Sequence, residues 1–414
     1  KILHTLSQKP EATGSGITIR EIISESHKRG YENFLLAGIS RGEKYCLPDY
    51  LTGKHIFVEF NSENLPFDVA GMSDVMPYKS TKFSDLSEED IIKYENSFRE
   101  KLITSVERFK PDIIHSHHLW LMTGLIKKTF PDIPLVAHCH GTDIRQIALC
   151  PQHRHRVISG CSQVNGVLAL SKAQKEQVIK TYGLSPEIVF LTGTGYNEKL
   201  FYNGFKEKKD RINILYAGKL SRAKGVYWLL EALNRINHFN WHLHMAGSGS
   251  GLEKDEILKK SEEMKNKVTW HGQISQKNLA ELMRTCHIFV LPSFYEGFPL
   301  VIIEALSSGC RIVVTELPAL TEMKSEKSMP FVSTVPLPRL NGPDRPVEEE
   351  LPLFVENLKK SLEEQLYLSG ENLSDEEITP LLKYYTWSEV LKESKRSMKL
   401  LFRTKETNFY KKTI

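Results

Sequence analysis

The chain has 414 residues, of which 40% are hydrophobic and 26% are charged, and its formal net charge is +4. This length exceeds one typical domain, so two or three are expected, and the composition is that of a soluble globular protein. The mild charge gives no reason to expect a nucleic-acid partner, and no apolar run approaches the roughly 20 residues that span a bilayer.

The first half of the chain (1–204) alternates short apolar runs with amphipathic stretches. A glycine-containing turn at 13–16 is expected to open a helix over 17–29, and a long amphipathic helix is predicted over 88–109. Strands are predicted over 2–6, 34–38, 111–115, 135–138 and 166–170. This alternation is typical of a doubly wound α/β domain.

A charged stretch at 203–211 is typical of a linker, and the alternation restarts after it with apolar runs at 212–218 and 242–247. We therefore predict a second α/β domain over 205–385. Residues 321–350 contain several prolines and predict no particular element.

Within the second domain, residues 287–315 form a predicted strand–loop–helix–strand unit. Pro299 suits the first turn of the helix and Gly309 suits its end. Ligands of parallel sheets bind at the carboxyl ends of the strands. Glu304 is unusual there, because its helix is apolar nearly all round. A buried carboxylate is costly unless it is hydrogen-bonded, and the hydroxyl groups of a ligand would satisfy it.

The C-terminal segment (386–414) is predicted to contain an amphipathic helix from Trp387 to about Thr404. The start at Lys1 has neither an initiating Met nor the apolar core of a signal peptide, so we expect at least one residue to be missing. The six cysteines lack a disulfide-framework spacing, which favours reduced thiols in a cytoplasmic protein. Basic helices such as 172–180 predict peripheral contact with the inner face of the membrane.

Glu296 and Glu304, with seven residues between them in a two-domain α/β chain, resemble the motif of the retaining GT-B glycosyltransferases of family 4, the glycogen-synthase-like group. The resemblance covers nearly the whole chain. It implies two Rossmann-like doubly wound domains that face a cleft, with a C-terminal helix that crosses back to the first domain. It also implies that Glu304 holds the ribose hydroxyls of the donor. Glu296 and the amides of Gly297, Phe298 and Leu300 would hold the donor sugar and phosphate.

The loop 218–225 resembles the basic loop in which this family uses two cations to grip the donor pyrophosphate. Lys219 and Lys224 take these positions, with Arg222 as a substitute for either. Their charges would stabilise the leaving group without a metal. A solvated basic loop is the alternative.

His140 and Asp143 belong to a segment that resembles the family motif at the donor-sugar site. By this resemblance His140 positions the sugar and stabilises an oxocarbenium-like transition state, and Asp143 contributes to substrate binding. Gly16 suits close approach of the backbone to a phosphate. Gly247 and Gly249 would line the base and phosphate pocket. Glycine-rich turns without a ligand are the alternative.

The first domain is also rich in histidine and cysteine. His115 and His117 would ligate a metal in a hydrolase, and Cys150, His153 and Cys161 would bind zinc. Neither set has a recognised zinc spacing, and adjacent residues of a strand point to opposite faces. A metal-dependent hydrolase stays an alternative, as does a non-catalytic sugar-nucleotide-binding protein on the same fold.

The resemblance implies a retaining hexosyltransferase that needs no metal or cofactor. It would move a hexosyl unit from a nucleoside-diphosphate sugar, with a UDP-sugar favoured, to a hydroxyl of a saccharide or lipid-linked acceptor, as in polysaccharide biosynthesis. No carboxylate of the first domain stands out as a nucleophile, which fits a front-face reaction. His117 or His118 is expected to approach the acceptor.

Overall fold

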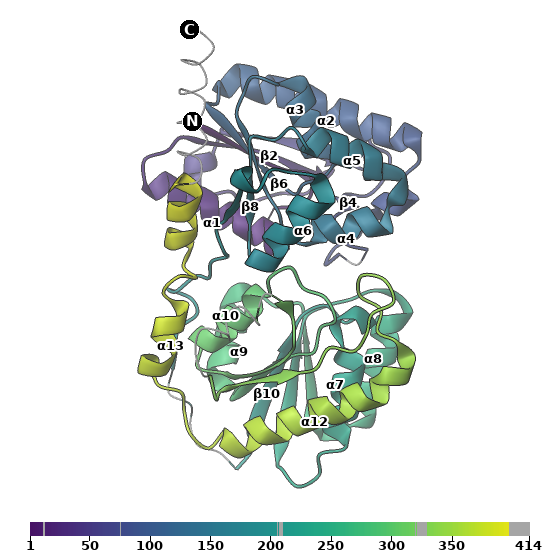
Figure 1. Cartoon of the computed structure of the whole chain (residues 1–414), viewed down its shortest axis with the longest axis vertical. Coiled ribbons are helices and arrows are strands. Elements are labelled where there is room, and N and C mark those ends of the chain that lie inside the picture. Colours follow the sequence, from purple (N-terminus) through teal and green to yellow (C-terminus); the bar gives the residue numbers. More distant parts are fainter. Residues whose placement is uncertain are drawn as a thin grey trace. The chain divides into compact units, whose positions relative to one another are not determined.

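The computed structural model shows two α/β units (Figure 1). Unit 1 comprises residues 1–195 and the segment that begins at Trp387, and unit 2 comprises residues 196–386. The sequence placed the corresponding boundaries at 204 and 385. The structure describes residues 1–10, 13–74, 76–204, 206, 210–318, 320 and 329–396, with only the backbone of Lys265.

Unit 1 is built on a seven-stranded sheet in which every pairing is parallel, in the order β3-β2-β1-β6-β7-β8-β9. Its strands are β1 (Ile2–Leu6), β2 (Asn33–Ser40), β3 (His55–Phe60), β6 (Ile113–His117), β7 (Leu135–His138), β8 (Gly166–Ala169) and β9 (Val189–Leu191), and a short separate pair joins β4 (Ala70–Gly71) to β5 (Thr81–Lys82). Its helices are α1 (Gly14–Lys28), α2 (Glu88–Phe109), α3 (Leu121–Thr129), α4 (Thr142–Leu149), α5 (Arg154–Cys161) and α6 (Lys172–Tyr182).

Helix α1 begins at Gly14, earlier than the predicted start at Ile17, because Thr13 caps it. The Thr13 hydroxyl accepts a hydrogen bond from the amide of Gly16 (3.2 Å). This bond satisfies one of the free amides of the first turn, so both glycines lie inside the helix. Helix α2 begins as the sequence predicts, and Ser87 and Asp90 form a capping box at its start.

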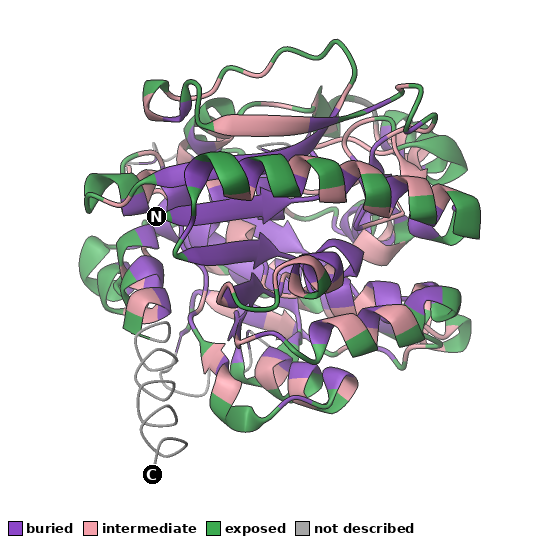
Figure 2. Ribbon diagram, turned by 90° about the horizontal axis from the view of Figure 1, so that it is seen from above, coloured by how far each residue is buried: buried purple, intermediate pink, exposed green. Residues whose placement is uncertain are grey.

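Both faces of the unit 1 sheet are buried, as in other parallel sheets. On one face Phe34 packs with Tyr94 and Phe98 of α2, and on the other Leu35 packs with Ile19 of α1. Figure 2 shows the strands near the N-terminus buried and the helix over them exposed only on its outer side. The strands therefore present their side chains to protein on both sides.

Four buried histidines share the face of the sheet that α1 covers. His4 lies in register with Leu35 on one side and His115 on the other, and His117 lies in register with His138. Because residues in register share a face and side chains alternate along a strand, these rings form one row across three strands.

Unit 2 has a six-stranded sheet, again with every pairing parallel, in the order β12-β11-β10-β13-β14-β15. Its strands are β10 (Ile212–Ala217), β11 (Trp241–Ala246), β12 (Val268–Gly272), β13 (Ile288–Leu291), β14 (Arg311–Thr315) and β15 (Val332–Val335). Its helices are α7 (Val226–Asn234), α8 (Gly251–Glu263), α9 (Gln276–Thr285), α10 (Leu300–Ser307), α12 (Leu351–Leu368) and α13 (Asp375–Leu382).

The strand–loop–helix–strand unit predicted over 287–315 is present as β13, α10 and β14. Strand β15 lies in the segment 321–350, where the sequence indicated no element. Within that segment, residues 321–328 lie outside the described part of the chain. No described helix combines the length and the hydropathy that a bilayer-spanning helix needs.

After unit 2 the chain returns to unit 1. Residues 387–396 are helical, and Arg29 donates hydrogen bonds to the carbonyl (2.7 Å) and hydroxyl (2.9 Å) of Ser388. Trp387 lies so close to Gly195 that a Cβ atom there would be 2.5 Å from its ring. The part of the predicted helix beyond residue 396 lies outside the described residues.

The loops at the carboxyl ends of β10, β11 and β13 pack backbone against backbone. The amide of Gly218 donates to the carbonyl of Ala246, and the amide of Leu220 donates to that of Ser248 (3.0 Å each). Gly225 has φ +69°, and a Cβ atom there would lie 2.0 Å from the Pro292 carbonyl oxygen. This close approach requires glycine.

We expect Gly225→Ala to destabilise unit 2 more than Gly251→Ala does. Both glycines lie at the start of a helix with a positive φ (+69° and +71°), so alanine costs about 1–2 kcal/mol at either position. Only at Gly225 does the added Cβ meet the backbone, since nothing lies within 4 Å of it at Gly251. Urea unfolding, monitored by tryptophan fluorescence, measures how much free energy of unfolding each variant loses. Equal losses would show that the loop at Gly225 has room for a Cβ atom.

Candidate functional site

Glu304 is a buried carboxylate of unit 2 that has no hydrogen-bond partner among the described residues. It lies on α10, where Ile302, Ile303, Ala305 and Leu306 are also buried. No residue in the described ranges donates a hydrogen bond to its carboxylate, and burial raises its pKa to about 7. An unsatisfied buried acid is costly to the fold, so the position suits a group that binds hydroxyl donors from outside.

Lys224 and Glu296 form an ion pair between two loops of unit 2. The Lys224 ammonium lies 2.5 Å from Glu296 Oε1 and 3.5 Å from the carbonyl oxygen of Tyr295. Both side chains are partly exposed. Burial, and after it the charge of Glu296, raises the pKa of the nearby Tyr216 hydroxyl, which donates to the Lys219 carbonyl oxygen (2.6 Å). The structure thus brings the loop of Lys219 and Lys224 close to Glu296.

Arg222 is engaged elsewhere in unit 2. Its guanidinium lies 2.9 Å from Glu256 of α8, and its amide donates to Glu253 (2.9 Å). The hydrogen bond to Glu256 raises the pKa of Arg222. Lys219 and Lys224 therefore stay the predicted phosphate-binding cations.

The loop that leads into α10 offers backbone donors of two kinds. The amides of Gly297 and Phe298 donate to no acceptor within the described residues. The amide of Leu300 donates to the Phe298 carbonyl oxygen (3.0 Å), so in this conformation it is occupied. A ligand that uses the Leu300 amide would have to replace this bond.

Gly247 and Gly249 have a packing reason that does not depend on a ligand. Gly247 has φ +134°, and a Cβ atom there would lie 1.9 Å from the Gly218 carbonyl oxygen. A Cβ atom at Gly249 would lie 2.5 Å from the Leu220 carbonyl oxygen. Loop packing alone thus explains both glycines, and their contact with a donor stays a prediction.

Asp143 is the organising group of the candidate site in unit 1. Its carboxylate is fully buried and accepts hydrogen bonds from the amides of Leu119 and His140 (2.7 Å to His140), and it lies 3.4 Å from His118 Nδ1. Burial favours the neutral acid, but His118 and the amide hydrogen bonds hold the pKa of Asp143 below its usual range. Both oxygens are used inside the protein, so this residue acts through the two loops that it joins.

His140 follows β7 and is half-buried. Its Nε2 lies 3.0 Å from Nδ1 of His117, the last residue of β6. Burial, and after it the nearby rings of His118 and His115, lowers the pKa of His140 well below the usual range. The ring is therefore neutral near pH 7, which suits positioning rather than proton donation as a cation.

His118 has a feature that sequence reasoning did not give it. Its φ of +76° is uncommon for a residue other than glycine, and such strain clusters at functional sites. Its amide donates to the His138 carbonyl oxygen (2.9 Å), and its own carbonyl accepts from Thr123 (2.6 Å). The amide of Gly16 is used in the cap of α1, so the structure ties that glycine to the helix start.

Gln8 links the loop after β1 to this site. Its side-chain amide donates to the hydroxyl of Ser15 (2.7 Å) and lies 3.5 Å from His118 Nε2, and its carbonyl accepts from the amide of Met72 (3.1 Å). Gln8 is buried, and the sequence offered no sign of its role because glutamine after a strand has no characteristic pattern.

The described structure does not group Cys150, His153 and Cys161, the alternative zinc ligands, at metal-ligand spacing. Cys150 donates to Gln146, His153 pairs with the Phe83 carbonyl oxygen, and Cys161 contacts the Trp120 carbonyl oxygen. Each side chain thus has its own local partner. Within the described residues the group with metal-ligand spacing is instead His4, His115 and His117.

Comparison with protein families gives one match in each half of the chain. The model of Glycosyltransferase Family 4 matches residues 82–199, and the model of Glycosyl transferases group 1 matches residues 211–334. An uncharacterised glycosyltransferase of Methanocaldococcus jannaschii is 27% identical over an alignment of 234 residues, and this alignment covers 52% of this chain and 60% of the relative. The match thus spans less than two thirds of that relative.

Two solved structures resemble the whole chain. Sucrose-phosphate synthase from Thermosynechococcus elongatus aligns with a TM-score of 0.68 at 18% identity and covers 98% of this chain and 100% of its own. HepE from Anabaena, in complex with UDP-glucose, aligns with a TM-score of 0.61 at 15% identity, and the alignment covers 97% of this chain and 99% of HepE. The predicted fold class, a GT-B protein of two Rossmann-like units, is confirmed.

We expect Glu304→Gln to remove a pH dependence of stability. The folded pKa of about 7 exceeds the unfolded value of 4.5, so the folded chain binds more protons between these values. The free energy of unfolding therefore falls as pH rises from 4.5 to 7, by up to about 3 kcal/mol. Urea unfolding of both proteins from pH 4.5 to 8 should show that the free energy of unfolding of the variant rises relative to that of the native chain as the pH increases.

Glu262→Gln, at an exposed position of α8, is the matched control for loss of one carboxyl group. A difference between Glu304→Gln and the native chain that does not change with pH would contradict the raised pKa.

Proposed function

We propose that this chain, which has the GT-B fold and is of the family-4 glycosyltransferase type, is a retaining hexosyltransferase. It moves a hexosyl unit from a nucleoside-diphosphate sugar to a hydroxyl of a saccharide or lipid-linked acceptor. The observation that carries this proposal is the carboxylate of Glu304, which is buried on the helix that follows strand β13 and has no partner among the described residues. The two neighbouring hydroxyls of a ribose supply the donors that this carboxylate lacks.

The loops of Lys224 and Glu296 in unit 2 support binding of the rest of the donor. Lys224 and Lys219 provide positive charge for a diphosphate, and Glu296 provides an acceptor for sugar hydroxyls. The unused amides of Gly297 and Phe298 supply further donors. In this proposal the ion pair between Lys224 and Glu296 opens, because the diphosphate competes for the ammonium group.

The chemistry that we assign to these residues is stabilisation of charge. As the bond from the sugar to the diphosphate breaks, negative charge grows on the phosphate, and Lys219 and Lys224 stabilise it without a metal. The neutral His140 ring positions the sugar. The acceptor attacks from the same face, and the departing phosphate takes its proton. This order keeps the anomeric configuration and needs no protein nucleophile.

Uridine is the base that we propose, and the complex of the similarly folded HepE with UDP-glucose supports this choice. We further propose a cytoplasmic enzyme of polysaccharide biosynthesis that contacts the inner face of the membrane peripherally. Its acceptor would lie on unit 1, near His117 and His118.

Thermal unfolding with a panel of nucleoside-diphosphate sugars in EDTA tests the donor site. A donor at 100 times its Kd stabilises the native chain by about 2.7 kcal/mol, which raises the melting temperature by roughly 5 °C. We expect one sugar nucleotide to give this shift with the native chain and with Glu262→Ala, but not with Glu304→Ala. NMR of the product with a suitable acceptor should show the donor's anomeric configuration.

A native chain whose melting temperature does not rise with any donor would contradict the donor site. An inverted product would contradict retention. Transfer that starts only after zinc or manganese is added would contradict a metal-independent reaction. Binding of zinc or manganese by a chain that binds no donor would favour the hydrolase alternative.

Donor binding should also release a proton at Glu304. About half of the free chains carry this proton at pH 7, and ribose hydroxyls that donate to the ionised carboxylate lower its pKa. Calorimetry at pH 7 in buffers with different ionisation enthalpies should give about half a proton per donor bound. Glu304→Gln should release none. A binding enthalpy of the native chain that is the same in every buffer would contradict the release of a proton from Glu304 when the donor binds.

A further inference from the structure

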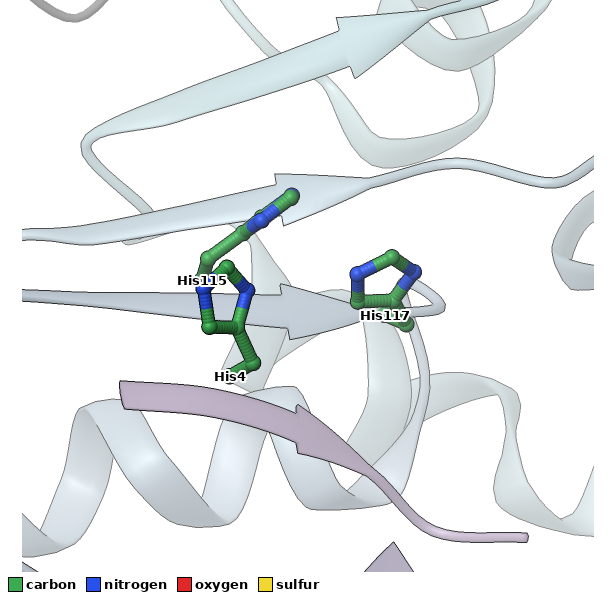
Figure 3. Close-up of side chains that lie close together, drawn as sticks. All are labelled: His4, His115 and His117. Atoms are coloured by element: carbon green, nitrogen blue, oxygen red, sulfur yellow. The ribbon is translucent and has the colours of Figure 1, made fainter. Parts of the chain in front are cut away.

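Three buried histidines of unit 1 bring their rings together on one face of the sheet. His4 of β1 lies in register with His115 of β6, and His117 follows two residues later on the same face. One ring nitrogen of each lies within 4.8 Å of the other two (Figure 3). Each residue is at most 1% exposed. The strand register alone places them there.

The hydrogen bonds of His4 determine which of its nitrogens carries the proton. Its Nε2 lies 3.0 Å from Oδ1 of Asn33. The Asn33 amide donates to the Tyr31 carbonyl oxygen (3.0 Å), and its Oδ1 also accepts from Ser26 (2.6 Å), which fixes the orientation of the amide. His4 Nε2 must therefore be the donor, and Nδ1 carries a lone pair.

The cluster contains three buried nitrogens that need a partner. His4 Nδ1, His115 Nε2 and His117 Nε2 have no hydrogen-bond partner in the described ranges. A buried polar atom left unpaired destabilises a fold, so three of them in one cluster indicate something that binds them together. Burial lowers the pKa of all three rings, and for His115 and His117 the neighbouring rings lower it further. The three rings are therefore neutral.

We propose that His4, His115 and His117 bind a divalent transition-metal ion of the class that prefers imidazole, for which Zn²⁺ is the test ion. Zinc takes neutral imidazole nitrogens as ligands and accepts three from a protein, with one position left for water or another group. A metal-bound histidine normally donates its other N–H to an oxygen or a similar acceptor. The bond from His4 to Asn33 has this form.

The ion would also set the tautomer of His140. With a metal on Nε2, His117 must carry its proton on Nδ1 and donate it to His140 Nε2, which lies 3.0 Å away. His140 would then keep its own proton on Nδ1. This consequence rests on the proposed function, but the metal site itself does not. The ion takes no part in the transfer, since it is enclosed in the core of unit 1.

The test is refolding with and without zinc. The native chain is unfolded in guanidinium with EDTA and refolded with or without zinc, and free zinc is then removed on a chelating resin. We expect about one zinc ion per chain by mass spectrometry of the metal, and a melting temperature several degrees above that of the zinc-free chain. Refolding with Co²⁺ should give the visible absorption of a tetrahedral ion.

His115→Leu removes one ligand and should abolish zinc retention. His138→Leu is the matched control, because His138 lies in the same row of rings and stacks on His117 but does not belong to the cluster. Both variants carry His271→Gln, since His271 pairs with His244 on unit 2 (3.0 Å) and such pairs bind zinc loosely.

Zinc retained equally by His115→Leu and the control would overturn the site, as would a native chain that refolds without retaining zinc. Should His115→Leu fail to fold, the cobalt spectrum of the native chain decides: absence of tetrahedral bands overturns the proposal. These readouts do not depend on a donor, so a failed donor screen with zinc retained would leave the metal site standing.

Discussion

The parallel register of the two sheets determines where every candidate residue lies. In unit 1 the pairing of β1 with β6 puts His4 beside His115, and the pairing of β6 with β7 puts His117 beside His138. In unit 2 the adjacency of β10 and β13 brings the loop of Lys224 to the loop of Glu296. Parallel strands end at the same edge of the sheet, so functional residues from distant parts of the chain lie close together there.

Two buried carboxylates show how the same group acquires opposite roles. Asp143 has its oxygens filled by amides and His118, which holds its pKa low and makes it a fixed anchor for the loops around it. Glu304 has no such donors among the residues that the structure describes, and burial raises its pKa. The first acid completes its hydrogen bonds within the fold. The second has no hydrogen-bond donor among the described residues, which is why the ligand proposal rests on it.

The sequence predicted those parts of the structure that depend on local pattern. Strands β1, β2, β6, β7, β8, β10 and β11, helices α1 and α2, the unit of β13, α10 and β14, and the buried position of Glu304 follow from apolar periodicity. It did not predict the start of α1, because the cap at Thr13 decides it, or β15, which is defined by its pairing with β14. The roles of Asp143 and Gln8 and the meeting of His4 with His115 depend on contacts across strands, which spacing along the chain does not contain.

The return of the chain to unit 1 has a consequence for synthesis on the ribosome. Residues 387–396 belong to unit 1, where Trp387 covers Gly195 and Val390 is fully buried, but all of unit 2 leaves the ribosome before them. The nascent chain must therefore hold an incomplete first unit while the second is made. Tyr196 already pairs with Tyr385 where the two connections meet (2.9 Å). The helix over residues 387–396 follows unit 2 directly in the chain, so it can complete unit 1 once unit 2 has been made.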